Sequence, residues 1–380
     1  MEALLKRLFP PGCELVPAAS VPKAQRFVII PGDDGPRWIA PLDWSLSEKV
    51  LRQWLPIGRA SRAKWRLAMI AHRLQCIGHI PGATVIGVAG LDRSAWAQVG
   101  VADDGDMVPV VYVARPSTTQ KAVVSLLSSR SGEVNRVVKV SLGSHAWSSL
   151  EREHANLETV GKMHPGIAPR PLGFYPTLGM TAQEWIEGEI RLSPPPQAAV
   201  DFLALLQQDD TTTTLGDLAQ RYRARLAALA GHEGESQFAR MLDSIRSDER
   251  VPKAFYHGDF VSWNLICQDD GACRAIDWEF SDRDGAPLLD LFHYLLRFPF
   301  AAGLIDSYHV AVRFSLQAHR PLVTRMLDRL GVSFRYAEDA LTLSFVALYV
   351  TRHHQVSAIE RTQPQLRAVA ASFGDARTLN

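Results

Sequence analysis

The segment from Tyr256 to Asp290 constrains the fold of this chain more than any other part of its sequence. Asn264 follows Asp259 by five residues, and Asp277 follows Asn264 by thirteen. Between Asn264 and Asp277, two short apolar runs flank an Asp-Gly turn, which is a strong signal for a β-hairpin. Because a hairpin brings its ends together, we expect Asn264 and Asp277 to lie side by side, one loop away from Asp259. Three oxygen-bearing side chains at one point suit a hard cation bound to phosphate.

These motifs resemble those of the aminoglycoside phosphotransferase and choline kinase group, which shares a protein-kinase-like fold. Protein kinases carry H-R-D-x-x-x-x-N in the catalytic loop and D-F-G in the metal-binding loop. Here Gly258 replaces that Arg, and Asp277-Trp278-Glu279 replaces D-F-G, as is usual for small-molecule kinases. The resemblance implies an α+β bilobal fold with an antiparallel-sheet N-lobe, a mainly helical C-lobe and, in this chain, an extra N-terminal α/β extension.

The resemblance also implies roles for the three clustered side chains. Asp259 is expected to orient the acceptor hydroxyl and to accept its proton as the catalytic base. Asn264 and Asp277 are expected to hold Mg²⁺, which bridges the phosphates of ATP or GTP.

Several neighbouring residues are expected to support this site. Gly285-x-Pro-x-x-Asp290 resembles the family's G-x-P-x-x-D, which implies that Asp290 braces the catalytic loop together with His257. Glu279 is expected to contribute to metal binding or to the order of that loop. His293, three residues after Asp290, is interpreted as a core histidine.

The nucleotide-binding half is predicted upstream. Three predicted strands match the order of a kinase N-lobe, at residues 107–113, 122–127 and 136–141. Lys139 lies in the third strand within V-V-K-V, and the resemblance implies that it reaches the α- and β-phosphates. A helix predicted over residues 147–163 carries its candidate partner, Glu153, and Glu151 remains an alternative.

Two segments of backbone are expected to meet the nucleotide. The predicted phosphate-covering loop, Pro116 to Lys121, contains no glycine, unlike G-x-G-x-x-G. Its backbone N–H groups are still expected to reach phosphate oxygens, at Ser117, Thr118 and Thr119. By position, residues 179–188 resemble the linker between the lobes. The adenine edge is therefore expected to meet the backbone of Glu184, Trp185 and Ile186.

Patterning divides the chain into three parts: residues 1–104, an N-terminal extension or small α+β domain; 105–188, the N-lobe and hinge; and 189–380, the C-lobe with the catalytic and metal-binding loops. The first part is predicted to contain a hairpin within residues 27–41 and helices at 46–55 and 61–78. The second helix is basic from Arg62 to Arg73, which indicates either a solvated face or a patch for an anionic or protein partner.

The C-lobe is predicted to be all-helical after the catalytic segment, with helices at 305–330 and 336–354. Residues Thr211 to Thr214 are predicted to form a turn before a helix.

Composition limits the other functional classes. The chain has 380 residues, is 47% hydrophobic and 21% charged, and has a net charge of +1. This bulk charge does not indicate a nucleic-acid partner or an anionic membrane, and no apolar run reaches the length of a membrane span. The first residues do not resemble a signal peptide. The four cysteines are scattered, although Cys267 and Cys273 flank the predicted hairpin turn, so reduced thiols and a cytoplasmic location are expected.

The expected acceptor is a hydroxyl of a small molecule or saccharide. The thirteen residues from Asp277 to Asp290 leave little room for a peptide-positioning loop, which argues against a protein kinase. An aminoglycoside pocket would be lined with acids, whereas the expected cleft is basic, at Arg297, Arg313, His319 and Arg320. A neutral or anionic metabolite is therefore favoured. A nucleotide-binding pseudokinase or scaffold and an aminoglycoside-modifying resistance kinase remain as alternatives.

Overall fold

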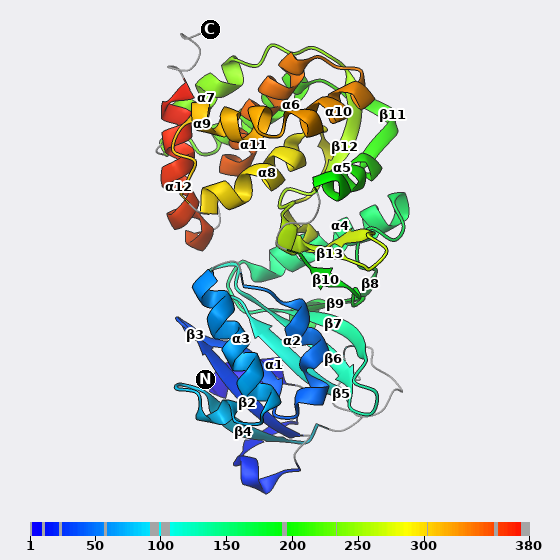
Figure 1. Cartoon of the computed structure of the whole chain (residues 1–380), viewed down its shortest axis with the longest axis vertical. Coiled ribbons are helices and arrows are strands. Elements are labelled where there is room, and N and C mark those ends of the chain that lie inside the picture. Colours follow the sequence, from blue (N-terminus) through cyan, green and yellow to red (C-terminus); the bar gives the residue numbers. More distant parts are fainter. Residues whose placement is uncertain are drawn as a thin grey trace. The chain divides into compact units, whose positions relative to one another are not determined.

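The computed structural model describes residues 2–9, 12–22, 25–56, 59–91, 99, 107–191, 196–232, 234–301, 303–352 and 356–373. The chain forms two compact units (Figure 1). Unit 1 comprises Met1–Gly161 and Ala168–Leu192, and unit 2 comprises Lys162–Ile167 and Ser193–Asn380.

Unit 1 is built on one nine-stranded sheet with the order β1-β4-β2-β3-β5-β6-β7-β9-β8. Every neighbouring pair in it is antiparallel. The strands are β1 (Glu14–Val16), β2 (Arg26–Gly32), β3 (Gly35–Pro41), β4 (Thr84–Ala89), β5 (Met107–Val113), β6 (Lys121–Ser128), β7 (Val134–Ser141), β8 (Pro171–Tyr175) and β9 (Met180–Gln183), and the short strand β10 (Glu189–Ile190) follows. The helices are α1 (Glu2–Leu8), α2 (Glu48–Gln53), α3 (Arg59–Arg73) and α4 (Ala146–Met163).

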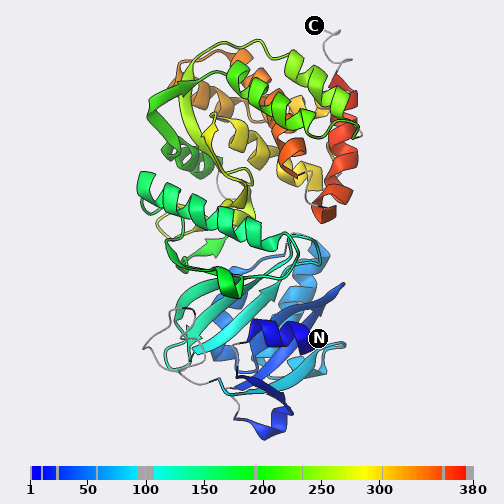
Figure 2. The same cartoon turned by 180° about the vertical axis from the view of Figure 1, so that it is seen from behind.

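Helices cover both faces of this sheet because its central strands are apolar on both sides. Phe27 of β2 belongs to a core that includes Leu5 and Leu8 of α1. Val28, the next residue, belongs to a second core that includes Ala68 of α3. Figure 1 shows α2 and α3 in front of the sheet, and Figure 2 shows α1 on the opposite face. Because successive side chains of a strand point to opposite faces of the sheet, neighbouring residues of β2 pack into two different cores.

The first hundred residues share this sheet with the predicted N-lobe. Trp38 of β3 is paired with Tyr112 of β5, and Ile39 is paired with Val111. The predicted boundary at residue 104 thus separates neither two sheets nor two cores among the residues that the structure describes. The physical reason is that β5 buries both of its faces, and the N-terminal strands complete the sheet beside it.

Unit 2 is mainly helical, with α5 (Pro196–Leu205), α6 (Leu215–Ala227), α7 (Glu235–Asp243), α8 (Leu289–Ala301), α9 (Tyr308–Val312), α10 (Arg320–Leu330), α11 (Phe334–Arg352) and α12 (Val356–Ala371). Its strands are β11 (Gln207–Thr213), β12 (Val251–Tyr256), β13 (Leu265–Cys267), β14 (Cys273–Ala275) and β15 (Asp282–Gly285). The predicted α+β class, with an antiparallel sheet followed by a helical part, is confirmed. No helix in the described ranges combines the length and apolar character of a membrane span.

Two predictions for unit 2 were wrong. Residues 207–213 form β11, which pairs with β12, rather than only a turn, because the Thr residues are β-branched and favour an extended backbone. The single helix predicted over 305–330 is divided into α9, a π-helical turn at Arg313–Gln317, and α10. Pro321, in the first turn of α10, starts a new helix there.

Removing residues 1–104 is expected to abolish cooperative folding of the rest of the chain. The truncation removes Phe27 and Ile39 from the core shared with Val111 and Leu126, and each fully buried side chain of this size contributes about 1.5–3 kcal/mol. A typical domain has a free energy of unfolding of only about 5–15 kcal/mol. Losing several such side chains from the core should therefore leave the truncated chain unfolded. Urea unfolding followed by circular dichroism checks this. A truncated chain that unfolds cooperatively at the midpoint of the full chain would show that the N-terminal part is an independent domain.

Candidate active site

In unit 1, two of the predicted nucleotide-binding residues form a buried ion pair. Lys139 on β7 and Glu153 on α4 are exposed by only 3% and 2%, and the Lys139 ammonium contacts the Glu153 carboxylate. Glu151, two residues earlier, lies on an exposed face of the same helix. A buried charge requires a partner of opposite sign, so Glu153 holds the Lys139 ammonium in place.

The loop between β5 and β6 lies against the start of α4. The backbone N–H groups of Leu142 and Gly143 donate to the carbonyl oxygen of Gln120, at 2.9 and 2.8 Å, and His145 N donates to Thr118 O at 2.7 Å. A Cβ on Gly143 would overlap the Thr118 carbonyl oxygen. The close approach of this loop to the start of α4 therefore requires a glycine at position 143, outside the loop.

The other two predicted loop residues face one another. The hydroxyl groups of Ser117 and Thr119 lie 3.4 Å apart. Together with Thr118, they form a compact turn of small polar residues.

The predicted hinge is anchored to Arg170, the residue before β8. Glu184 N donates to Arg170 O at 2.9 Å, and Arg170 N donates back to the Glu184 carboxylate at 3.0 Å. Trp185 packs against the core beneath α2 and α3. These contacts therefore fix the position of the hinge backbone within unit 1.

A second anchor of the hinge comes from α2, and no motif in the sequence indicates it. The Gln53 amide donates to the carbonyl oxygens of Ile186 and Gly188, at 2.8 and 3.1 Å. Lys49, one turn earlier, pairs with Glu187 at 2.6 Å. No local sequence signal connects residues that are more than a hundred positions apart, so only the fold reveals this contact.

In unit 2, a single carboxylate accepts hydrogen bonds from the predicted catalytic loop. Asp290, at the start of α8 and 5% exposed, accepts hydrogen bonds from His257 N at 2.7 Å and from Gly258 N at 3.0 Å. Burial raises the pKa of Asp290 to about 7, the two N–H donors oppose this shift, and the Asp259 carboxylate reinforces it. The loop is therefore held by a buried acid whose two hydrogen-bond donors here are neutral backbone N–H groups.

The His257 ring is also fixed by two backbone groups. Its Nδ1 accepts from Asp259 N at 3.2 Å, and its Nε2 lies 3.0 Å from Ile276 O. Because a carbonyl only accepts, the proton of the neutral ring lies on Nε2.

Gly258 explains why this loop cannot carry a larger residue. Its φ is +78°, and a Cβ there would lie 2.5 Å from the carbonyl oxygen of Phe280. The close approach brings the loop against the segment after Asp277, so the replacement of Arg by Gly has a steric cause.

Asp259, Asn264 and Asp277 lie around the open end of the β13–β14 hairpin. The Asn264 amide group donates to Asp259 O at 2.9 Å and to the Asp259 carboxylate at 3.2 Å. Ile276 N donates to Asn264 O at 2.9 Å, which closes the hairpin beside Asp277. Asp277 has a left-handed backbone with φ 62°, a conformation that is uncommon for residues other than glycine and concentrates at functional sites.

The donor chemistry of Asn264 and Asp277 fits Mg²⁺. Because the amide nitrogen of Asn264 faces Asp259, its orientation is fixed and its Oδ1 points elsewhere. Mg²⁺ takes oxygen ligands and uses only one or two protein groups together with substrate phosphates. In the described part of the chain, no cluster of three or more His, Cys, Asp or Glu residues suits a metal.

The hairpin is linked internally by a disulfide, contrary to the expectation of reduced thiols. Cys267 and Cys273 are directly opposite in the β13–β14 register and are bonded, with Cα atoms 4.1 Å apart. Cys13 and Cys76 are not part of a disulfide. The predicted hairpin brings the two cysteines face to face, which the sequence had indicated only as an option.

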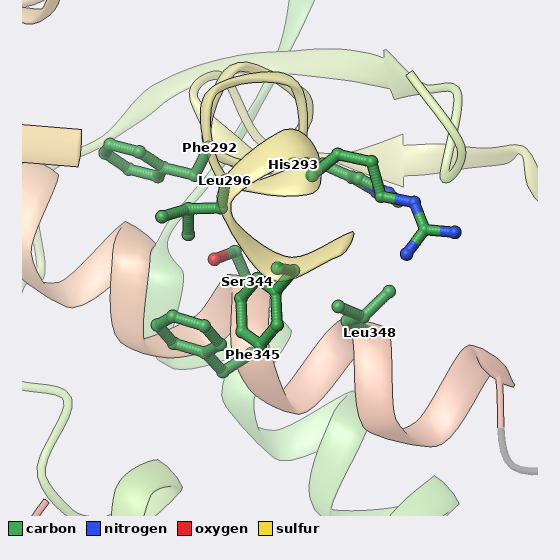
Figure 3. A pocket seen from close by; sticks show the side chains of 8 residues that line it. Phe292, His293, Leu296, Ser344, Phe345 and Leu348 are labelled. Carbon is green, nitrogen blue, oxygen red and sulfur yellow. The ribbon is translucent and has the colours of Figure 1, made fainter. Parts of the chain in front are cut away.

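His293 of α8 belongs to this site as well as to the core. Its Nε2 lies 3.6 Å from the Asp259 carboxylate, and its side chain is only 5% exposed. It lines a small, mainly apolar cavity of about 20 Å³ (Figure 3), with Phe292, Leu296, Arg297, Phe300, Ser344, Phe345 and Leu348. The sequence interpretation of His293 as a purely structural residue missed its position beside Asp259.

Arg297 is the one member of the predicted basic cleft that lines this pocket. Its guanidinium lies 5.5 Å from the ring centre of Trp263, the residue before Asn264. Arg313 and Arg320 are exposed elsewhere in unit 2, and burial lowers the pKa of His319. The pocket therefore has a cationic edge contributed by one residue.

The buried Asp290 gives a pH-dependent prediction. Its pKa of about 7 in the folded chain exceeds its ordinary value of 3.8. The folded chain therefore holds a proton on Asp290 at pH values where the unfolded chain has lost it. This contribution to the free energy of unfolding is fully present below the ordinary pKa and is lost as pH rises through about 7. Relative to Asp290→Asn, the wild-type free energy of unfolding should fall by roughly 4 kcal/mol between these limits. Urea unfolding of both proteins across this pH range checks the prediction, and a constant difference between them would contradict it.

A family model described as "APH: Phosphotransferase enzyme family" matches residues 123–322, which is more than half of the 380 residues. A comparison with curated protein sequences found no match.

Solved structures give weaker similarities. The ethanolamine kinase of Plasmodium vivax is 14% identical, with 70% of this chain and 81% of that chain covered and a TM-score of 0.43. The choline kinase LicA of Streptococcus pneumoniae is 16% identical, with coverage of 67% and 92% and a TM-score of 0.42. The macrolide 2′-phosphotransferase MphH of Brachybacterium faecium is 12% identical, with coverage of 74% and 97% and a TM-score of 0.44.

At these identities and TM-scores, the solved structures say nothing about the acceptor of this chain. The family match is independent of them, and it spans Lys139 and the whole segment from Tyr256 to Asp290. The chain belongs to the APH phosphotransferase enzyme family.

Proposed function

We propose that this chain transfers the γ-phosphoryl group of a nucleoside triphosphate, ATP or GTP, to a hydroxyl group of a small molecule or saccharide. The observation that carries the proposal is the Asp259 carboxylate, hydrogen-bonded to Asn264 at the open end of the hairpin that leads to Asp277. Phosphoryl transfer requires a positioned base and a charged clamp for the phosphates rather than covalent chemistry.

Asp259 acts on the acceptor. Its carboxylate accepts a hydrogen bond from the acceptor hydroxyl, which aims the oxygen at the γ-phosphorus in line with the bond to the β-phosphate. As the new O–P bond forms and the bond to the nucleoside diphosphate breaks, the hydroxyl proton passes to Asp259. The amide of Asn264 holds the carboxylate in this orientation.

Each unit carries residues whose chemistry suits phosphate binding. Lys139, fixed by Glu153, neutralises the α- and β-phosphate oxygens. Asn264 and Asp277 would hold Mg²⁺, which when bound supplies further positive charge to the phosphates. Backbone N–H groups of the loop would contact the phosphates, at Ser117, Thr118 and Thr119, and the hinge backbone at Glu184, Trp185 and Ile186 would contact the base.

The cavity beside His293 has room for about one water molecule, and it is proposed to mark the edge of the acceptor site rather than to enclose the acceptor. His293 lies next to Asp259, the cavity is walled by buried aromatic and aliphatic side chains, and Arg297 lies at its edge. A cationic edge repels a polycation such as an aminoglycoside, whereas it tolerates a neutral acceptor and attracts an anionic one. A neutral or anionic metabolite with an apolar portion is therefore the proposed acceptor class.

Replacing Asp259 tests the catalytic assignment. Asp259→Ala removes the proton acceptor, and general-base catalysis contributes about 10²–10⁴-fold, so kcat should fall by that factor. The assay is mass-spectrometric detection of phosphorylated products from a panel of neutral, anionic and cationic hydroxyl metabolites with ATP or GTP. Asp269→Ala, at an exposed position of the hairpin turn, is the matched control. Full turnover by Asp259→Ala would refute this role, and a wild-type protein that binds nucleotide without transfer would favour a pseudokinase.

A second pair of variants separates folding from catalysis at Lys139. Lys139→Met leaves the buried Glu153 carboxylate without its cation, and breaking such a pair costs about 3–5 kcal/mol. Adding Glu153→Gln removes the uncompensated charge, so the double variant should recover most of the lost stability while phosphoryl transfer stays impaired. Thermal unfolding and the transfer assay on the same samples check this. Recovery of activity together with stability would show that the pair is purely structural.

A further inference from the structure

Helix α3 has two apolar faces, of which the fold uses only one. Trp65, Ala68 and His72 face the sheet, where Trp65 packs on Trp38 and the His72 ring contacts Pro41 O at 2.9 Å. This face fixes the helix on unit 1 (Figure 1). Burial lowers the pKa of His72, so it contributes no charge to the surface.

The other apolar face points to solvent. Leu67, Ile70 and Leu74 follow the i, i+3, i+7 spacing of one helix face, and they are exposed by 65%, 56% and 69%. They account for half of the large hydrophobic residues that are exposed in the described chain, the others being Phe174, Leu205 and Leu304. We call Leu67, Ile70 and Leu74 the α3 stripe. An exposed apolar stripe of this kind marks an interaction surface.

Cations flank the α3 stripe. Arg66 and Arg73 lie seven residues apart, and so on one side of it, while Lys64 lies on the other side; all three are exposed. The sequence of α3, RASRAKWRLAMIAHR, contains no acidic residue. Within the ranges that the structure describes, no acidic side chain forms an ion pair with Lys64, Arg66 or Arg73. The net charge of +1 for the whole chain conceals this local concentration.

We propose that α3 binds the surface of an anionic lipid bilayer. The stripe would insert its three aliphatic side chains among the lipid headgroups, while Lys64, Arg66 and Arg73 would meet lipid phosphates and carboxylates. Long cationic side chains beside an apolar ridge suit such an interface, because their stems lie along apolar surface while their charges reach the headgroups. Anionic lipids attract Lys and Arg clusters electrostatically.

The shape and charge favour lipid over a protein partner. The stripe is a convex ridge on one helix, which a fluid surface accommodates without a complementary groove. Its flanks carry a single sign of charge, whereas a protein interface usually fixes its register with both signs. The helix is already folded on the sheet, so binding would not need to order it.

Vesicle co-sedimentation of the full-length protein tests the proposal. We expect binding to vesicles of phosphatidylcholine mixed with phosphatidylserine, little binding to phosphatidylcholine alone, and release at high salt. The triple variant Leu67→Gln/Ile70→Gln/Leu74→Gln should lower the partition coefficient by at least about tenfold. Arg66→Gln and Arg73→Gln should each lower it by roughly fivefold. Leu205→Gln/Leu304→Gln, at similarly exposed leucines (54% and 55%) in unit 2, is the matched control and should bind like wild type.

Two results would overturn the proposal: a wild-type protein that stays in the supernatant with the anionic vesicles, or a stripe variant that binds them as well as wild type. If wild type ignores vesicles but self-associates on size exclusion, and the stripe variant does not, then a second copy covers the stripe and the lipid proposal is wrong. None of these residues belongs to the proposed catalytic machinery. Phosphoryl transfer by the stripe and arginine variants in solution should therefore equal that of the wild type. If the wild type itself showed no phosphoryl transfer, that result would contradict the proposed function and not the lipid proposal.

Discussion

The hydrogen bonds from His257 and Gly258 to the Asp290 carboxylate are the constraint on which the candidate site depends. They join the loop after β12 to the first turn of α8. An acid near a helix N-terminus is stabilised by the helix dipole and by unpaired N–H groups, which offsets part of the cost of burying it. With the loop fixed in this way, the carboxylate of Asp259 has a defined place beside Asn264 and His293.

The same constraint accounts for the residue types around it. A loop drawn onto Asp290 passes so close to Phe280 that position 258 has no room for a side chain. His257 then satisfies two backbone groups at once, Asp259 N and Ile276 O, and so connects the catalytic loop to the end of the hairpin. Asp277 adopts its left-handed backbone directly after that contact. The glycine of the His-Gly-Asp motif and the left-handed backbone of Asp277 therefore both result from the close packing of this loop against the segment after the hairpin.

What the sequence could predict was local. The β13–β14 hairpin follows from alternating apolar residues and an Asp-Gly turn, and the Lys139 strand follows from its flanking valines, because these signals lie within a few residues of each other. The contacts that escaped prediction join distant positions. Gln53 meets Ile186, His293 meets Asp259, and β3 meets β5. No local pattern records such pairings, since they result from how the sheets and helices pack.

The N-terminal hundred residues illustrate that limit most clearly. Read along the sequence, they look like an appendage, but their strands extend the sheet that carries Lys139, and Gln53 and Lys49 of α2 hold the hinge backbone and its Glu187 side chain. Single exposed apolar side chains are common on folded proteins, whereas a contiguous exposed group of them marks an interaction surface. Helix α3 exposes Leu67, Ile70 and Leu74 opposite the face that it buries. The inner face of this region thus serves the fold, and its outer face has a composition that the fold does not explain.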